Sequence, residues 1–164
     1  MSYLENIKDG KELANRLFSE FLNVAVTKVT ISYKACATID FGKDLIVKIK
    51  TSKGLDQFTR GEWSFWLYAC SWRLDLNGKP KIGSSDSEEG IKDTLSILHG
   101  KKLLKANILN SAFDLLLQFE NNLVLSVFSC ETEDPEPWSL STPDGMVFSA
   151  RADDKWDYKK SSLN

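Results

Sequence analysis

The side chains best suited to chemistry are one histidine, three cysteines and a few aspartates. His99 is the only histidine in the chain, which excludes metal sites built from several histidines and leaves a Cys–His pair as the one conventional nucleophilic arrangement. The surrounding pattern predicts that His99 ends a helix, where the helix dipole and free carbonyl groups favour an imidazolium. We therefore interpret His99 as a helix-terminal residue and not as a general base.

The cysteines show no spacing typical of a metal site. Cys36, Cys70 and Cys130 are odd in number, widely separated and set in apolar or alternating segments. Free cysteine in such segments behaves as a small hydrophobic residue, so we expect buried, reduced thiols. Glycine-rich phosphate loops and the G-x-S-x-G nucleophile motif do not occur in the chain. The sequence predicts no metal and no other cofactor.

Carboxylates are the remaining route to catalysis. Asp40, Asp44 and Asp114 lie near predicted strand ends, where two of them could form the acid and base of a hydrolase. That chemistry requires the side chains to converge in one pocket, within about 10 Å of each other. Turns and solvated strand ends explain these aspartates more simply, and we predict a protein that is not an enzyme.

An aromatic run from Gly61 to Trp72 is the first segment that could serve binding. Alternation along a strand places Trp66 and Tyr68 on one face, together with Trp72, and Trp63 on the other. A strand that is apolar on both faces is usually central and covered on each side. Aromatic residues fill cores and interfaces alike, so the second interpretation is a partly exposed aromatic groove that binds a partner through Trp66 and Tyr68.

The second segment is an acidic loop broken by prolines. Its candidate partner-binding residues are Glu131, Glu133, Asp134 and Glu136. Most charge clusters are simply solvated, but prolines reduce the entropy of the free loop and so favour docking. Such a loop would steer a basic partner, such as the active face of a nuclease toxin.

A near-repetition indicates the architecture that must position these residues. The pattern F-x-x-x-L-x-[VL]-x-[IV], followed by W-x-L and a glycine turn, runs from Phe41 to Gly78 and again from Phe119 to Gly145. We predict an α+β fold of two β-rich pseudo-repeats of antiparallel strands, with an N-terminal helix and a connecting helix. Residues 1–164 form one domain, divided into a first repeat (1–83), a connecting helix with the second repeat (84–151) and a polar tail (152–164).

Local patterns give the expected elements of the first repeat. Apolar residues at three- and four-residue spacing predict an amphipathic helix from Lys11 to Leu22. We expect a tight turn at Gly42-Lys43-Asp44, a loop over 51–62 and a long aromatic strand over 63–74. Asn77-Gly78 is a dipeptide favoured in hairpin turns.

The second repeat has comparable signals. Ser87 is a candidate N-cap of the connecting helix, and Gly100 is a candidate residue just beyond its end. Asn121-Asn122 predicts a turn between two strands, and Pro143-Asp144-Gly145 predicts a terminal hairpin. The connection between the repeats is polar, as expected of a boundary.

Composition limits the classes of partner. The 164 residues carry a formal net charge of −2, so the chain lacks the overall positive field on which nucleic-acid binding usually rests. No apolar run approaches the roughly 20 residues that span a bilayer, and the N-terminus has no basic stretch followed by an apolar core. We expect a cytoplasmic protein with no nucleic-acid or membrane partner.

Several segments resemble a group of small uncharacterised bacterial cytosolic proteins. They are Trp72–Lys79, Gly100-Lys101-Lys102, the strand pair through Asp114-Leu115 and Phe119, and Trp138–Gly145. These motifs consist of turn and core residues, so the resemblance carries no catalytic residue to this chain. In size, acidity and α+β build the chain is also similar to bacterial toxin-immunity proteins.

The leading functional hypothesis is a non-catalytic protein-binding module, namely an immunity protein that binds and blocks a cognate bacterial toxin. Its partner would be a basic toxin domain. The alternative is a small-molecule-binding or sensor module with an aromatic cleft between the pseudo-repeats, lined by Trp63, Trp66 and Trp72. Oligomeric state is open at this point.

Overall fold

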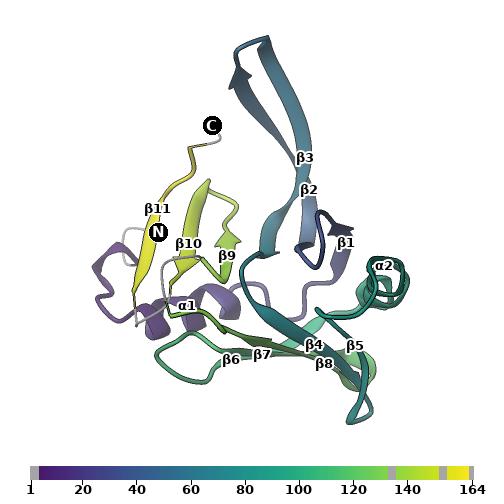
Figure 1. Ribbon diagram of the computed structural model, residues 1–164. Coiled ribbons are helices and arrows are strands. Elements are labelled where there is room, and N and C mark those ends of the chain that lie inside the picture. Colours follow the sequence, from purple (N-terminus) through teal and green to yellow (C-terminus); the bar gives the residue numbers. More distant parts are fainter. Residues whose placement is uncertain (1–3, 133–135, 152–154, 163–164) are drawn as a thin grey trace.

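Two antiparallel sheets form the framework of the protein (Figure 1). The computed structural model describes residues 4–132, 136–151 and 155–162. The larger sheet has the order β1–β2–β3–β9–β10–β11, with bounds Val26–Ile31, Ala37–Thr51, Gly54–Leu67, Trp138–Ser141, Met146–Ala150 and Trp156–Lys160. The smaller sheet has the order β5–β4–β8–β7–β6, with bounds Lys79–Gly83, Ser71–Leu76, Leu123–Phe128, Leu115–Phe119 and Leu103–Ile108.

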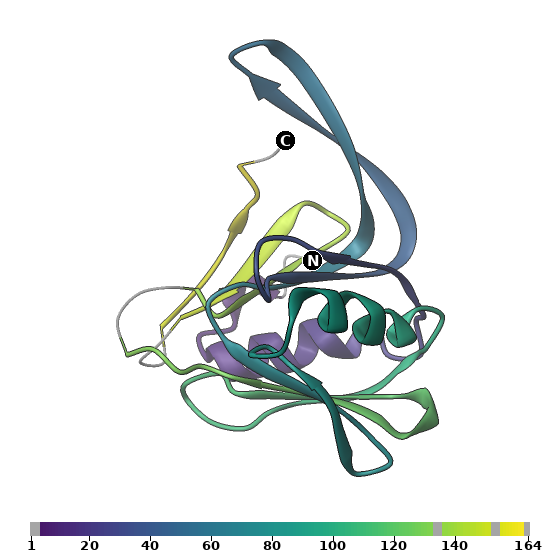
Figure 2. The ribbon, with the colours of Figure 1, turned by 45° about the vertical axis from the view of Figure 1, so that its right-hand side comes forward.

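Two short helices lie between the sheets (Figure 2). Helix α1 (Gly10–Ser19) is capped at its N-terminus by Asp9, whose carboxylate accepts hydrogen bonds from two backbone N–H groups of the first turn. Helix α2 (Glu88–Leu95) begins at Ser87, as predicted, and continues into the 3₁₀ turn η2 (Ser96–Leu98). Two further 3₁₀ turns, η1 (Leu4–Asn6) and η3 (Glu120–Asn122), complete the helical elements of the described residues.

Aromatic side chains fill the space between the sheets. Phe18 of α1 packs edge-on against Phe65 of β3 and against Trp138 of β9. Phe41 and Phe119 join the two sheets directly, with ring centroids 6.4 Å apart and nearly parallel planes. The inner face of the larger sheet is therefore committed to the core, which leaves its outer face to solvent.

The predicted turn at Gly42-Lys43-Asp44 is wrong, because these residues form a bulge inside the single strand β2. The pairing slips between Phe41 and Asp44, and Gly42 takes a positive φ of 74°, which suits glycine. The predicted loop over 51–62 is likewise wrong, since β3 begins at Gly54 and pairs with β2 along its whole length. Residues 44–61 thus form a projecting two-stranded hairpin, which we call the arm.

The structure does not confirm the pseudo-repeats. Phe41 and Leu45 are separated by a bulge within one strand, whereas the matching Phe119 and Leu123 are separated by a turn between two strands. The matching W-x-L motifs lie in different sheets, one in β4 and the other in β9. The predicted strand over 63–74 is also interrupted, since β3 ends at Leu67 and β4 begins at Ser71 in the other sheet.

Several local predictions are confirmed. Asn77 and Gly78 both have positive φ and form the turn between β4 and β5. Gly100, with a φ of 77°, follows His99 at the end of η2.

The predicted tail, 152–164, contains a strand: β11 pairs with β10 and forms one edge of the larger sheet.

Candidate binding groove

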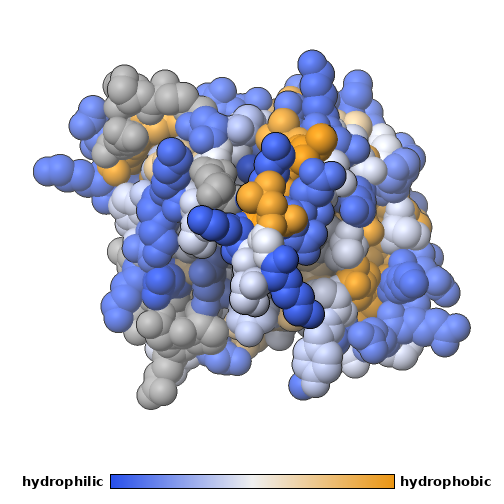
Figure 3. Space-filling view, turned by 90° about the horizontal axis from the view of Figure 1, so that it is seen from above, coloured by the Kyte–Doolittle hydropathy of each residue, from blue (hydrophilic) through white to orange (hydrophobic). Residues whose placement is uncertain are grey.

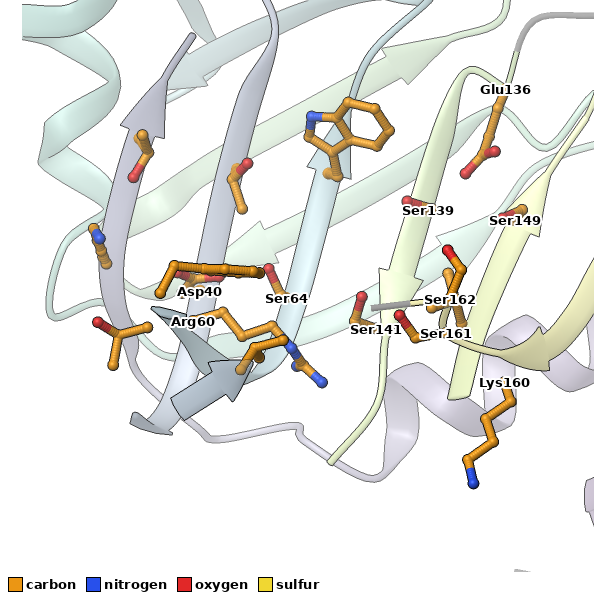
Figure 4. Close-up of a pocket in the computed structure, with 18 of the residues that line it drawn as sticks. Asp40, Arg60, Ser64, Glu136, Ser139, Ser141, Ser149, Lys160, Ser161 and Ser162 are labelled. Carbon is orange, nitrogen blue, oxygen red and sulfur yellow. The ribbon is translucent and has the colours of Figure 1, made fainter. Parts of the chain in front are cut away.

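A cavity of about 710 Å³ lies over the outer face of the larger sheet (Figure 4). Its floor comes from β1, β2, β3, β9, β10 and β11, and one wall comes from the arm. The arm rises from the sheet and curves back above this face, as Figure 2 shows. We call this cavity the groove.

Strand register arranges the floor in two rows. The first row runs across all six strands through Lys28, Asp40, Ser64, Ser141, Val147 and Lys159. The second runs through Thr30, Thr38, Trp66, Ser139 and Ser149. Side chains directly opposite each other on paired strands are near neighbours, so each row is a continuous track across the sheet. The second track consists mainly of short side chains that carry hydroxyl groups, and the first track adds Ser64 and Ser141 at its centre, which leaves room above them.

Trp66 is the one large aromatic side chain on the floor among the described lining residues. It is 37% exposed and stacks on Tyr68, with ring centroids 4.8 Å apart. Its neighbours in sequence, Phe65 and Leu67, are fully buried on the opposite face. The aromatic run therefore serves both purposes: alternate residues fill the core, and Trp66 with Tyr68 stays partly exposed.

The bulge at Gly42 decides which side of the arm faces the groove. Phe41 points into the core, and uninterrupted alternation would place Leu45 and Val47 on that same side. The extra residue reverses the alternation, so Val47 pairs with Phe58 and both line the groove. On the other side of the arm Ile46 and Leu55 are 67% and 71% exposed. Figure 3, seen from above, shows hydrophobic side chains gathered on the arm among hydrophilic ones.

Arg60 ties the base of the arm to the sheet. Its guanidinium donates hydrogen bonds to the carbonyl oxygens of Gly61, Glu62 and Thr142, at 2.8, 3.2 and 3.0 Å. Burial lowers the pKa of Arg60 from its usual value, and the nearby carboxylate of Asp40 partly offsets that effect. Asp40 is 4% exposed and accepts a hydrogen bond from Ser64 at 2.6 Å.

Replacing Arg60 with methionine should destabilise the protein. The change removes three hydrogen bonds to carbonyl oxygens and leaves the buried Asp40 without its neighbouring cation, which we expect to cost about 2 kcal/mol. Urea denaturation measures the loss. The matched control is Arg73→Met, because Arg73 pairs with Asp75 on the exposed surface, where such pairs contribute little. Equal losses for the two variants would contradict the role assigned to Arg60.

The predicted partner-binding residues are only partly brought together. Trp66 and Glu136 line the groove, and Tyr68 lies beside Trp66. Glu131 is exposed and does not line the groove. Glu133 and Asp134 lie outside the described residues. The cleft predicted between Trp63, Trp66 and Trp72 is wrong, because Trp63 and Trp72 are 8% and 2% exposed and belong to the core.

The predicted catalytic alternatives do not converge. Asp40 lies on the floor of the groove, whereas Asp44 lies on the outer side of the arm with Ile46. Asp114 belongs to the loop before β7, where it accepts hydrogen bonds from Asn110 and Ser129. Burial raises the pKa of Cys70 to about 12, the reverse of what an activated thiol requires. His99 is exposed at the end of η2, as predicted.

All three cysteines are free, which agrees with the predicted reduced thiols. Cys36 and Cys70 are half-buried, but Cys130 is exposed, so the prediction of burial is wrong there. It assumed an apolar segment, whereas Cys130 follows the end of β8, where the chain leaves the sheet.

Sequence reasoning missed most of the groove. Lys28, Lys159, Phe58 and the floor serines carried no motif, although the serines alternate with core residues in β3 and β9. That alternation was the available signal for a hydroxyl-rich outer face.

The lining of the groove combines hydroxyl groups, lysine side chains and an apolar wall. Within residues 4–132, 136–151 and 155–162, no cluster of three histidine, cysteine or acidic side chains has the arrangement of a metal site. The same part of the chain contains no helix of the length and apolarity that crossing a membrane requires. No known protein family, curated protein or solved structure matches the chain.

Proposed function

We propose that this protein is a non-catalytic binding module that holds a segment of a partner protein in the groove. The observation that carries the proposal is the combination of a hydroxyl-rich sheet face with an arm that curves above it and presents apolar side chains toward it. Grooves with an apolar wall and a few polar groups are the usual binding sites of proteins.

The length of the floor favours a polypeptide ligand. Six strands spaced by about 4.8 Å place the two ends of the first row about 24 Å apart along the sheet. An extended segment of about seven residues covers that distance, as does a helix of about 16 residues. Compact small molecules are shorter than this track.

The arm also supports a protein partner. A two-stranded hairpin that projects from the body is marginal by itself in water. This one additionally exposes Ile46 and Leu55 on its outer side and Phe58, at 39%, on its inner side. A segment bound in the groove would cover Phe58 and would add its own contacts to the inner side of the arm, so binding should stabilise the arm.

The role that we propose for this binding is blockade of a bacterial toxin, as an immunity protein of the cytoplasm. Three free cysteines are consistent with a reducing compartment. The acidic residues Glu131 and Glu136 remain candidates for steering a toxin domain whose overall charge is basic. Neutralisation would follow from occlusion, with one molecule bound per toxin.

Co-expression with the toxin encoded beside its gene tests this proposal. The chain should protect cells and co-purify with that toxin. Replacing Val47 with glutamate places a charge on the inner wall of the groove and should weaken co-purification by about tenfold or more. Ile46→Glu is the matched control, because Ile46 lies on the outer side of the arm. If the wild-type chain neither protects nor co-purifies, the proposed function is wrong.

A small-molecule sensor is the second candidate, favoured by the cavity volume of about 710 Å³, which lies within the usual range for ligand pockets. A metabolite that fills the groove should raise the melting temperature and change the fluorescence of Trp66. A flat thermal-shift response across a broad library would remove this candidate.

A further inference from the structure

We propose that the groove takes an acidic, amphipathic segment of the partner, with carboxylates placed toward its two ends and apolar side chains turned toward the arm. This inference rests on the proposed function, because it names the chemistry of the segment that the groove would hold. The charge expected for this segment is therefore opposite to that of the basic surface that the acidic loop would attract.

The charge of the groove is opposite to that of the chain. Arg60, Lys28, Lys159 and Lys160 line it, against the carboxylates of Asp40 and Glu136, while the whole chain has 21 basic and 23 acidic residues. Asp40 and Arg60 interact with each other, so their charges largely compensate. The lysines therefore dominate the charge that a ligand would contact, and among the described lining residues only Glu136 opposes them.

The lysines stand at the two ends of the floor. Lys28 lies on β1 and Lys159 on β11, which are the two edge strands of the larger sheet. Both side chains are exposed, and Lys159 has a weak ion pair with Asp157 at 3.7 Å. Asp157 is held more closely by Arg151, at 2.7 Å, which leaves Lys159 free to pair with a ligand. Carboxylates about 24 Å apart along a segment would match both ends.

The middle of the groove sets the rest of the ligand chemistry. Val47 and Phe58 form an apolar wall, and Trp66 adds an aromatic surface on the floor. Beside Trp66, Ser139 and Ser141 of β9 offer hydroxyl groups that can donate to carboxylates or to backbone carbonyls. A segment with one apolar side and one acidic side could pack against the wall and Trp66 and could pair with both lysines at the same time.

A nucleic acid fits these observations less well. The cations stand at opposite ends and do not form the continuous basic stripe that follows a phosphate backbone. Tyr68 stacks on Trp66, so one face of the Trp66 ring is already covered. The net charge of −2 would also oppose approach of a polyanion.

Selection from a displayed library of random peptides, each about twelve residues long, tests the inference on the full chain. Selected peptides should be enriched in Asp and Glu together with aromatic or aliphatic residues. The double variant Lys28→Glu/Lys159→Glu should bind them at least about tenfold more weakly. The matched control is Lys81→Glu/Lys105→Glu, which makes the same change in net charge on exposed edge strands of the other sheet and should leave the affinity unchanged.

The outcomes separate this inference from the proposed function. Peptides that compete for the groove and lose affinity with Val47→Glu, but are basic or insensitive to the lysine double variant, overturn the acidic ligand and leave the binding function intact. A library that yields no peptide sensitive to Val47→Glu counts against the proposed function itself. Tighter binding of a single-stranded oligonucleotide than of any peptide, lost in the lysine double variant, would also overturn the inference.

Discussion

Replacing Trp138 with alanine lowers the free energy of unfolding by about 4 kcal/mol, the largest effect that we expect from a single core substitution here. Trp138 is fully buried in β9 and has ring contacts with four phenylalanines: Phe18, Phe65, Phe113 and Phe148. Its indole N–H also donates to the carbonyl oxygen of Phe113 at 2.9 Å. The variant would leave a large cavity between α1 and both sheets, together with an unpaired buried carbonyl.

Trp66→Ala is the control for this substitution, because the two tryptophans lie on opposite faces of the same sheet. Trp66 is 37% exposed, and its truncation should cost about 1 kcal/mol, mainly from lost packing on Tyr68. Urea denaturation of both variants gives the comparison. Equal losses would mean that the inner face of the larger sheet does not carry the core.

Gly61→Val should cost about 3 kcal/mol and should also disturb the arm. A Cβ atom at Gly61 would lie 2.8 Å from the backbone nitrogen and oxygen of Phe41 and from the Cβ of Asp40, closer than real Cβ contacts. These atoms belong to the strand that Gly61 faces across the bulge, so the backbone would have to move. We expect groove binding to fall together with stability, since the arm would no longer be held in place.

The control for Gly61→Val is Gly83→Val, at the end of β5. A Cβ atom there meets nothing closer than 3.5 Å, and valine suits a strand. Its unfolding free energy should stay within about 0.5 kcal/mol of the wild-type value. A wild-type melting curve for Gly61→Val, or a loss shared equally with Gly83→Val, would show that the bulge tolerates a side chain.

In our proposal the two faces of the larger sheet serve different purposes: the inner face supports stability and the outer face binds the partner. Trp138 and Phe65 act on the inner face, whereas Trp66, Lys28 and Lys159 lie on the outer face. Substitutions in the second set can therefore report on binding without unfolding the protein. This separation makes the lysine and Val47 variants interpretable as tests of function.

Local signals were sufficient for the helices and for the tight turns. The stripe of Leu13, Leu17 and Phe18 predicts α1 because a helix brings residues three and four apart onto one side. Ser87, Gly100 and Asn77-Gly78 act on backbone groups within a few residues of themselves, so their effects can be read without knowing the rest of the fold. Antiparallel strands and the α+β class follow from the same local periodicities.

The bulge and the arm depended on pairing between distant residues. Gly42 has the local appearance of a turn residue. It is an insertion within β2 only because the residues on either side of it, Phe41 and Asp44, both pair with β3. The charged stretch after Gly54 looks like a loop, yet pairing with β2 satisfies its backbone hydrogen bonds and makes it a strand. A reading based on spacing alone then assigns Leu45 and Val47 to the wrong face.

By itself, the sequence determined the two helices and the turns at Asn77-Gly78 and Gly100, because propensity, capping and periodicity act between near neighbours. Only the tertiary structure decided that β3 pairs with β9 and that β4 belongs to the other sheet. It also decided that Lys28 and Lys159 line one groove. The physical reason is that strand partners far apart in sequence pair so that their apolar residues share one buried core. The residues that alternate with these core residues then form the outer face of the sheet.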